Sequence, residues 1–196
     1  GIPVDAATHY QPDVQQVRAA WRDNVAALMV ASPSNPTGTL LGAEQLQALH
    51  AEVTAHEASL VVDEIYHGLG YDAPTPSVLE VSPEAFVINS FSKFFGMTGW
   101  RLGWVVAPGW MIEPMERLAQ NIFLAAPTVA QYAALAAFSD ENMEILEQRR
   151  QAFQMRRDLL YRELVGLGLG VGGVPAGAFY IYADIARFTD DSMDFT

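Results

Sequence analysis

Hydrophobic and polar residues follow two patterns along this chain, short apolar runs and helical periodicity. Four short apolar runs predict β-strands over residues 26–31, 60–63, 85–89 and 102–107. Elsewhere apolar residues return about once per helical turn, which predicts helices over 12–23, 43–57, 110–123, 127–139 and about 141–165. Another apolar run, at 178–182, predicts a strand near the C-terminal end.

The first three predicted strands are apolar without alternation, which is typical of strands buried on both faces of a parallel sheet. We therefore expect an α/β fold, with a mostly parallel sheet flanked by helices. The long helix that starts near residue 141 leads into what we expect to be a smaller α+β domain. The predicted division is a partial large domain over 1–140 and the start of a small domain over 141–196.

Polar side chains gather where each of the first three predicted strands ends. Ligands of such sheets bind outside the carboxyl ends of the strands, so these side chains predict a site at that edge. They are Ser34 and Asn35 after the first strand, Asp63 and Tyr66 after the second, and Ser90, Ser92 and Lys93 after the third.

The amino-acid composition excludes several kinds of binding partner and several kinds of catalytic chemistry. Hydrophobic residues make up 51% of the chain and charged residues 17%, so a packed core is expected. The formal net charge of -12 argues against nucleic acid and membrane surfaces as partners. The chain has no cysteine, which excludes disulfides, thiolate catalysis and cysteine-based zinc sites. With no apolar run long enough to span a membrane and no recognisable signal peptide, we expect a cytoplasmic protein.

Two other patterns have ordinary structural explanations. Gly168, Gly170 and Gly173 fit G-x-G-x-x-G, but the dinucleotide fingerprint requires a strand before it and a helix after it. Here a predicted helix precedes and a predicted strand follows, so a loop that ends the helix is expected. The four histidines do not stand at metal-ligand spacing, and His50 and His56 fall on different faces of a helix. No metal site is predicted.

Lys93 is the strongest candidate for chemistry. It lies among aromatic and small residues directly after an apolar strand, in a chain with only 11 Lys and Arg residues. A desolvated lysine presents a neutral amine that can attack an aldehyde. Ser90, Ser92 and Arg101 could donate hydrogen bonds to a phosphate. The alternative is a surface lysine whose stem lies along apolar neighbours.

Asp63, Tyr66 and Asn35 supply further polar groups at the same edge. Asp63 follows an apolar strand and is expected to be buried, so its carboxylate needs a cationic or N–H partner. A protonated pyridine nitrogen is such a partner. Tyr66 and Asn35 can donate to a phenolate oxygen. Structural alternatives are a helix cap or ion pair for Asp63, packing for Tyr66, and turn formation for Asn35.

Three sequence blocks, in this order and at these spacings, carry a specific resemblance. They are Ser34-Asn35-Pro36-Thr37-Gly38, then Asp63-Glu64-Ile65-Tyr66, then Ser90-Phe91-Ser92-Lys93 followed by Gly99-Trp100-Arg101-Leu102-Gly103. The chain resembles the class I/II aminotransferase family of fold-type I pyridoxal-phosphate enzymes. The likeness extends to Gly177-Ala178-Phe179-Tyr180.

The resemblance implies a role for each candidate residue. Lys93 would form the Schiff base with pyridoxal 5′-phosphate and carry the proton, and Asp63 would pair with the pyridine nitrogen. Asn35 and Tyr66 would contact the ring hydroxyl oxygen, while the phosphate would be held by Ser90, Ser92 and Arg101. In this family the peptide bond that matches Asn35-Pro36 is often cis.

The implied activity is transfer of an amino group between an amino acid and a 2-oxo acid, in a homodimer. Complete members are about twice as long. Their glycine-containing phosphate loop would lie upstream of Gly1, and their arginine for the substrate carboxylate downstream of Thr196. Two alternatives share the fold: a pyridoxal-phosphate lyase or synthase, and a non-catalytic sensor domain of a transcription regulator.

Overall fold

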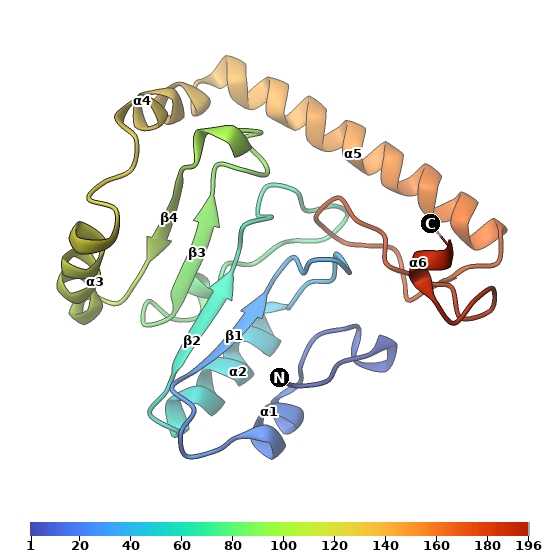
Figure 1. The fold of residues 1–196 in the computed structure, drawn as a ribbon, viewed down its shortest axis with the longest axis horizontal. Helices are drawn as coiled ribbons and strands as arrows, with labels where there is room; N and C mark the ends of the chain where they lie inside the picture. Colours follow the sequence, from blue (N-terminus) through green and yellow to red (C-terminus); the bar gives the residue numbers. More distant parts are fainter. Residues whose placement is uncertain (196) are drawn as a thin grey trace.

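The computed structural model describes residues 1–195, and its centre is a mixed β-sheet. In this part of the chain the main sheet has four strands, in sequence order: β1 (Ala27–Ala31), β2 (Ser59–Asp63), β3 (Phe86–Ser90) and β4 (Gly103–Val106). β1, β2 and β3 are parallel, and β4 runs antiparallel to β3 (Figure 1). The first four predicted strands and the mainly parallel α/β sheet are confirmed.

The register brings the ends of the parallel strands level with one another. Ala31 pairs with Asp63, and Asp63 pairs in turn with Ile88. The segments that follow β1, β2 and β3 therefore leave the sheet at a single edge, as the sequence predicted.

The five predicted helices are all present. They are α1 (Val14–Ala20), α2 (Ala43–Ala55), α3 (Gly109–Ile122), α4 (Thr128–Ala137) and α5 (Asp140–Gly166). α1 is shorter than the predicted 12–23 because Asp13 caps its first turn, accepting from Gln16 N at 2.7 Å. After α5 the chain turns at Gly168, whose φ of 85° favours glycine, so the glycine-rich segment ends a helix.

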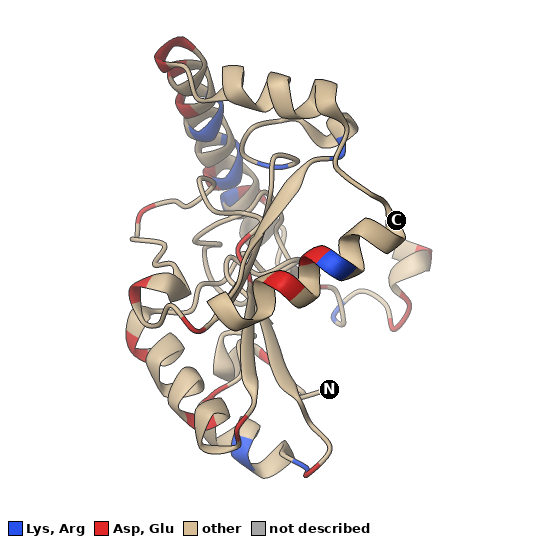
Figure 2. Cartoon of the chain, turned by 90° about the vertical axis from the view of Figure 1, so that its left-hand side faces the viewer, with Lys and Arg blue, Asp and Glu red and all other residues tan. Residues whose placement is uncertain are grey.

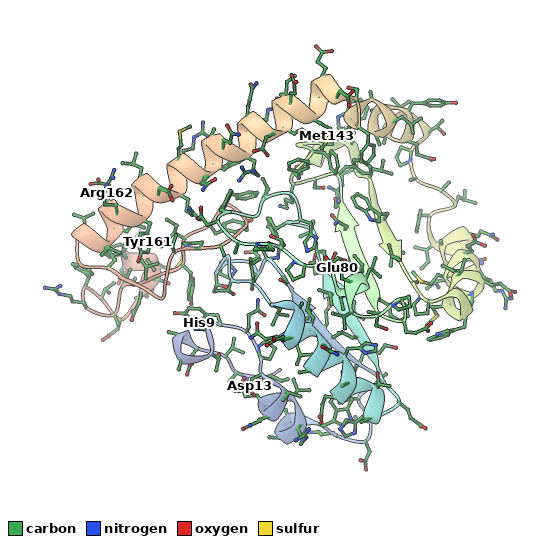
Figure 3. The ribbon with its side chains drawn as sticks, turned by 180° about the vertical axis from the view of Figure 1, so that it is seen from behind. His9, Asp13, Glu80, Met143, Tyr161 and Arg162 are labelled. Carbon is green, nitrogen blue, oxygen red and sulfur yellow. The ribbon has the colours of Figure 1, made fainter. Side chains whose placement is uncertain are left out.

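The main core lies between the sheet and the two helices α1 and α2. Figure 3 shows α2 in front of the strands when the molecule is seen from behind. The buried residues come from alternate strand positions and from the facing helices: Val17, Leu28, Val30, Leu46, Leu49, Val53, Leu60, Val62 and Val87. The expectation that the first three strands are buried on both faces is wrong for β1 and for β3, since Met29 is 62% exposed and Ile88 is 38% exposed.

The predicted strand over 178–182 is wrong. Two short strands flank this segment, β5 (Gly170–Val171) paired with β6 (Ala183–Asp184), and the residues between them bond to the loops that follow β1 and β2. Ala178 has a φ of 61°, which breaks an extended conformation, and its N–H donates to Leu69 O at 2.9 Å. α5 begins at Asp140, beside the predicted boundary, but the division into two domains stays a prediction.

Charged residues lie mainly on the helices and loops. Figure 2 shows acidic and basic residues along α5, whereas the strands of the sheet are almost free of charge. The first turn of α5 carries Asp140 and Glu141, which interact favourably with the helix dipole. In the part of the chain that the structure describes, no helix is both long and apolar enough to cross a membrane.

Candidate functional site

The loop after β1 presents Asn35 at the edge of the sheet. Its conformation includes two cis peptide bonds, Ser32-Pro33 and Asn35-Pro36, so the cis bond implied by the resemblance is present. Ser34 N donates to Thr39 O at 2.9 Å, and this closes the loop. Asn35 is exposed, and its Nδ2 donates to Tyr66 Oη at 3.5 Å.

The segment after β2 supplies an acid and a phenol. Asp63 is half-buried, not buried as expected, because it lies on the face of β2 that points away from the core residues Leu60 and Val62. Its Oδ1 accepts from Ile65 N at 3.0 Å. Tyr66 is buried, and burial, followed by its hydrogen bond with a second tyrosine, raises its pKa well above the ordinary value. Tyr66 is therefore a protonated donor at neutral pH.

Lys93 lies on the turn that follows β3 and is half-buried. Its Nζ is 5.4 Å from the ring centroid of Tyr66 and 5.5 Å from that of Phe179. Two aromatic rings therefore cover the amine. Lys93 is also the single lysine of the chain, the remaining 10 of the 11 basic residues being arginines.

Ser90, Ser92 and Arg101 form a second polar group close to Lys93 in the chain. Ser90 ends β3, and its Oγ lies 2.9 Å from Ser92 Oγ. Thr98 connects the serines to the arginine: its Oγ1 donates to Ser92 O at 2.7 Å, and its carbonyl accepts from Arg101 Nη1 at 2.9 Å. Arg101 is exposed. The two hydroxyls and the guanidinium thus belong to one hydrogen-bonded turn.

Two residues at the site were not predicted as site residues. The Tyr180 hydroxyl lies 2.9 Å from that of Tyr66, and Phe179 packs against Tyr66 with ring centroids 5.5 Å apart. Both belong to the Gly177-Ala178-Phe179-Tyr180 block, so the sequence contained a signal. The signal was missed because these residues were expected to form a strand. A prediction of local secondary structure does not reveal that their rings contact a segment more than 110 residues earlier.

A buried acid supports the segment that carries Tyr66. Glu64 is 3% exposed, and its carboxylate accepts from Ser77 Oγ and, at 2.8 Å, from Val78 N. His67 Nδ1 lies 3.4 Å from Glu64 Oε2. Burial lowers the pKa of His67, whereas the charge of Glu64 and a hydrogen bond with the Ser32 backbone raise it. The effect of burial is the larger, so the pKa of His67 lies below its ordinary value.

The lowered pKa of His67 predicts a loss of stability in mild acid. As the pH falls through about 6.5, unfolded chains take up a proton that folded chains bind less well, so the free energy of unfolding decreases. We expect His67→Gln to lose less stability than the wild type when urea denaturation at about pH 7.5 is compared with about pH 5.5. Equal losses in the two proteins would contradict the assignment.

Comparison with known proteins gives one consistent result. Residues 2–193 match the model of the family described as aminotransferase class I and II. The chain is 38% identical to the valine–pyruvate aminotransferase of Mycobacterium tuberculosis over 99% of this chain and 50% of that protein. It is 38% identical to the aspartate aminotransferase of Geobacillus stearothermophilus over 93% of this chain and 48% of that protein.

Solved structures agree with the sequence matches. An aminotransferase from Mycobacterium tuberculosis superposes with a TM-score of 0.94 at 36% identity, over 99% of this chain and 50% of that one. The aspartate aminotransferase from Thermus thermophilus with maleate gives 0.92 at 35% identity, over 98% and 51%. The chain spans about half the length of the curated relatives it matches. It therefore belongs to the class I and II aminotransferase family.

Proposed function

We propose that the protein carrying this chain is a pyridoxal-phosphate-dependent aminotransferase, which moves an amino group between an amino acid and a 2-oxo acid. The observation that supports this most directly is the placement of Lys93. In a chain of the aminotransferase family, its single lysine lies at the carboxyl edge of the parallel strands with its amine beside two aromatic rings.

The side chains at this edge fit the chemistry of pyridoxal phosphate. Lys93 offers an amine for an aldehyde, and Asp63 offers a carboxylate for a pyridinium nitrogen. Tyr66 and Asn35 offer hydrogen-bond donors for a ring oxygen. The hydrogen-bonded turn of Ser90, Ser92 and Arg101 would hold the phosphate, since hydroxyl and guanidinium donors suit its oxygens.

When bound, pyridoxal phosphate supplies an electron sink for the carbanion chemistry of the amino acid. Asp63 would favour the protonated pyridine nitrogen through its negative charge. Lys93 would hold the cofactor through its Nζ and would also carry a proton at that atom. The rings of Tyr66 and Phe179 lie on two sides of the amine and keep water away from them.

The proposed substrates are a class of amino acids and 2-oxo acids. Relatives with similar identity are named for valine and pyruvate, for aspartate, for aspartate and prephenate, and for aromatic amino acids. These names span aliphatic, acidic and aromatic side chains. What they share is an amino acid donor and a 2-oxo acid acceptor, and this is the substrate class that we propose.

The test is covalent capture of the cofactor by the full-length protein. We expect added pyridoxal phosphate to give a visible absorption band, and borohydride to fix one cofactor to the peptide that contains Lys93, as read by mass spectrometry. Because Lys93 is the single lysine of this chain, a label elsewhere in residues 1–196 would have to lie on another type of residue.

Lys93→Arg is the matched variant, since it keeps a positive charge and a long stem but cannot form the bond to an aldehyde. We expect the band and the label to be lost in this variant. A band of unchanged intensity in Lys93→Arg would overturn the assignment. Amino transfer is then measured with several amino acids and 2-oxoglutarate, and release of ammonia without transfer would favour a lyase.

A further inference from the structure

The hydroxyls of Tyr66 and Tyr180 form a pair at the edge of the site. They lie 2.9 Å apart, and either oxygen could be the donor. Asn35 Nδ2 also donates to Tyr66 Oη, at 3.5 Å. Among the residues that the structure describes, Tyr66 is the one hydrogen-bond partner of the Tyr180 hydroxyl.

When an anionic oxygen occupies the site, the number of phenol protons fixes the direction of the hydrogen bond between Tyr66 and Tyr180. A phenol has one proton to donate, while its oxygen can still accept. If Tyr66 gives its proton to a ligand oxygen, it has none left for Tyr180. The 2.9 Å bond must then run from Tyr180 to Tyr66. A donor that accepts a hydrogen bond is polarised and becomes a stronger donor.

Tyr180 is held in this position by backbone contacts close to it in the chain. Ala178 N donates to Leu69 O, and Ala178 O accepts from Tyr71 Oη at 2.6 Å. Gly177 N donates to Gly38 O at 2.9 Å. These contacts anchor the segment to the loops that follow β1 and β2. The anchoring is tight, because a Cβ on Gly177 would lie 2.6 Å from a side-chain carbon of Pro33.

We propose that Tyr180 is a positioning residue, which donates to Tyr66 and thereby aims and strengthens the hydrogen bond from Tyr66 to an anionic ring oxygen of the cofactor. This inference rests on the proposed function for the identity of the ligand. In this role Tyr180 acts through Tyr66.

The test follows the visible absorption band of the full-length protein loaded with pyridoxal phosphate as a function of pH. A hydrogen bond to the ring oxygen stabilises its negative charge and lowers the pH at which the band changes. We expect Tyr180→Phe, which keeps the ring, to raise the midpoint by about 0.5 pH unit. Tyr66→Phe should raise it by about 1 to 2 pH units, because it removes the donor itself.

The double variant Tyr66→Phe/Tyr180→Phe distinguishes a positioning role of Tyr180 from a general structural effect of its replacement. In the Tyr66→Phe background, Tyr180→Phe should cause no further shift, because its partner is gone. Tyr182→Phe is the matched control: this tyrosine is 50% exposed, packs edge-on against Tyr10, and should leave the midpoint unchanged. An unchanged midpoint in Tyr180→Phe, or a shift that persists without the Tyr66 hydroxyl, would overturn the inference.

Failure of the proposed function gives a different result. In that case the wild type shows no lysine-bound band at all, and the tyrosine pair is then tested in the cofactor-free protein by alkaline titration of tyrosine absorbance. A bonded pair ionises in two coupled steps, so the effects of Tyr66→Phe and Tyr180→Phe should be non-additive. Additive effects would overturn the pairing.

Discussion

Arg157→Met is expected to lower the free energy of unfolding by about 3 kcal/mol. The Arg157 side chain is 7% exposed, and its guanidinium has four partners, one of which is the exposed neighbour Asp158, which accepts from Nε at 2.9 Å. Its Nη1 donates to Pro175 O at 2.8 Å, its Nη2 donates to Asp72 at 2.6 Å, and its charge lies 4.9 Å from the Tyr71 ring centroid. Methionine keeps most of the stem but leaves the buried carbonyl of Pro175 without its donor.

The size of this effect is set by burial and not by charge alone. Asp72 is 58% exposed, so its carboxylate can be solvated when Arg157 is removed, and the ion pair itself contributes little. The larger losses are the bond to Pro175 O and the packing against Tyr71, both inside the protein. Arg157→Lys keeps the charge but loses the planar fork, and an intermediate loss is expected.

Urea denaturation measures the effect, with Arg162→Ala as control. Arg162 is on the same helix, α5, its side chain is 71% exposed, and Figure 3 shows it near the far end of the helix. Its replacement should change stability by less than about 0.5 kcal/mol. If the variants at 157 and 162 proved equally stable, Arg157 would not be the link between α5 and the loops that it contacts.

Glu64→Ala is expected to lower the free energy of unfolding by about 2 to 3 kcal/mol. Its carboxylate accepts from Ser77 Oγ at 3.0 and 2.9 Å and from Val78 N at 2.8 Å. Alanine leaves the buried N–H of Val78 and the half-buried hydroxyl of Ser77 without this acceptor, and it removes the anion beside His67. Glu64→Gln retains an acceptor oxygen, so it should lose less than the alanine variant.

The matched control for Glu64 is Glu84→Ala, since Glu84 is an exposed acid on the turn that precedes β3. We expect a change within about 0.5 kcal/mol there. Thermal or urea unfolding of the three variants gives the comparison. Should Glu64→Gln prove as unstable as Glu64→Ala, the negative charge and not the acceptor geometry would be what the site requires.

Most elements of the large sheet could be predicted because their signals are local. The apolar runs of β1, β2 and β3 and the helical spacing of Leu46, Leu49 and Val53 are properties of short stretches of chain. The turn chemistry between them is equally local. Burial was harder to predict, since the exposure of Met29 depends on what covers the outer face of β1.

Some residues of the candidate site could likewise be predicted from local sequence, and others could not. Six site residues could be predicted because each stands at or after the end of an apolar strand, and parallel strands bring these ends together. They are Asn35, Asp63, Tyr66, Ser90, Ser92 and Lys93. Their roles stay predictions. Tyr180 and Phe179 could not be placed this way, because their contacts with Tyr66 depend on a chain reversal after α5.

Local pattern and strand order were therefore enough to predict the α/β class, the polar residues at the strand ends and the choice of Lys93. The groups that surround the amine of Lys93 depend instead on contacts between segments that are far apart in the chain. Backbone bonds at Gly177 and Ala178, with the left-handed conformation of Ala178, return a distant segment to the sheet and bring a second tyrosine to the first. Such contacts between remote segments leave no periodic signal in the sequence.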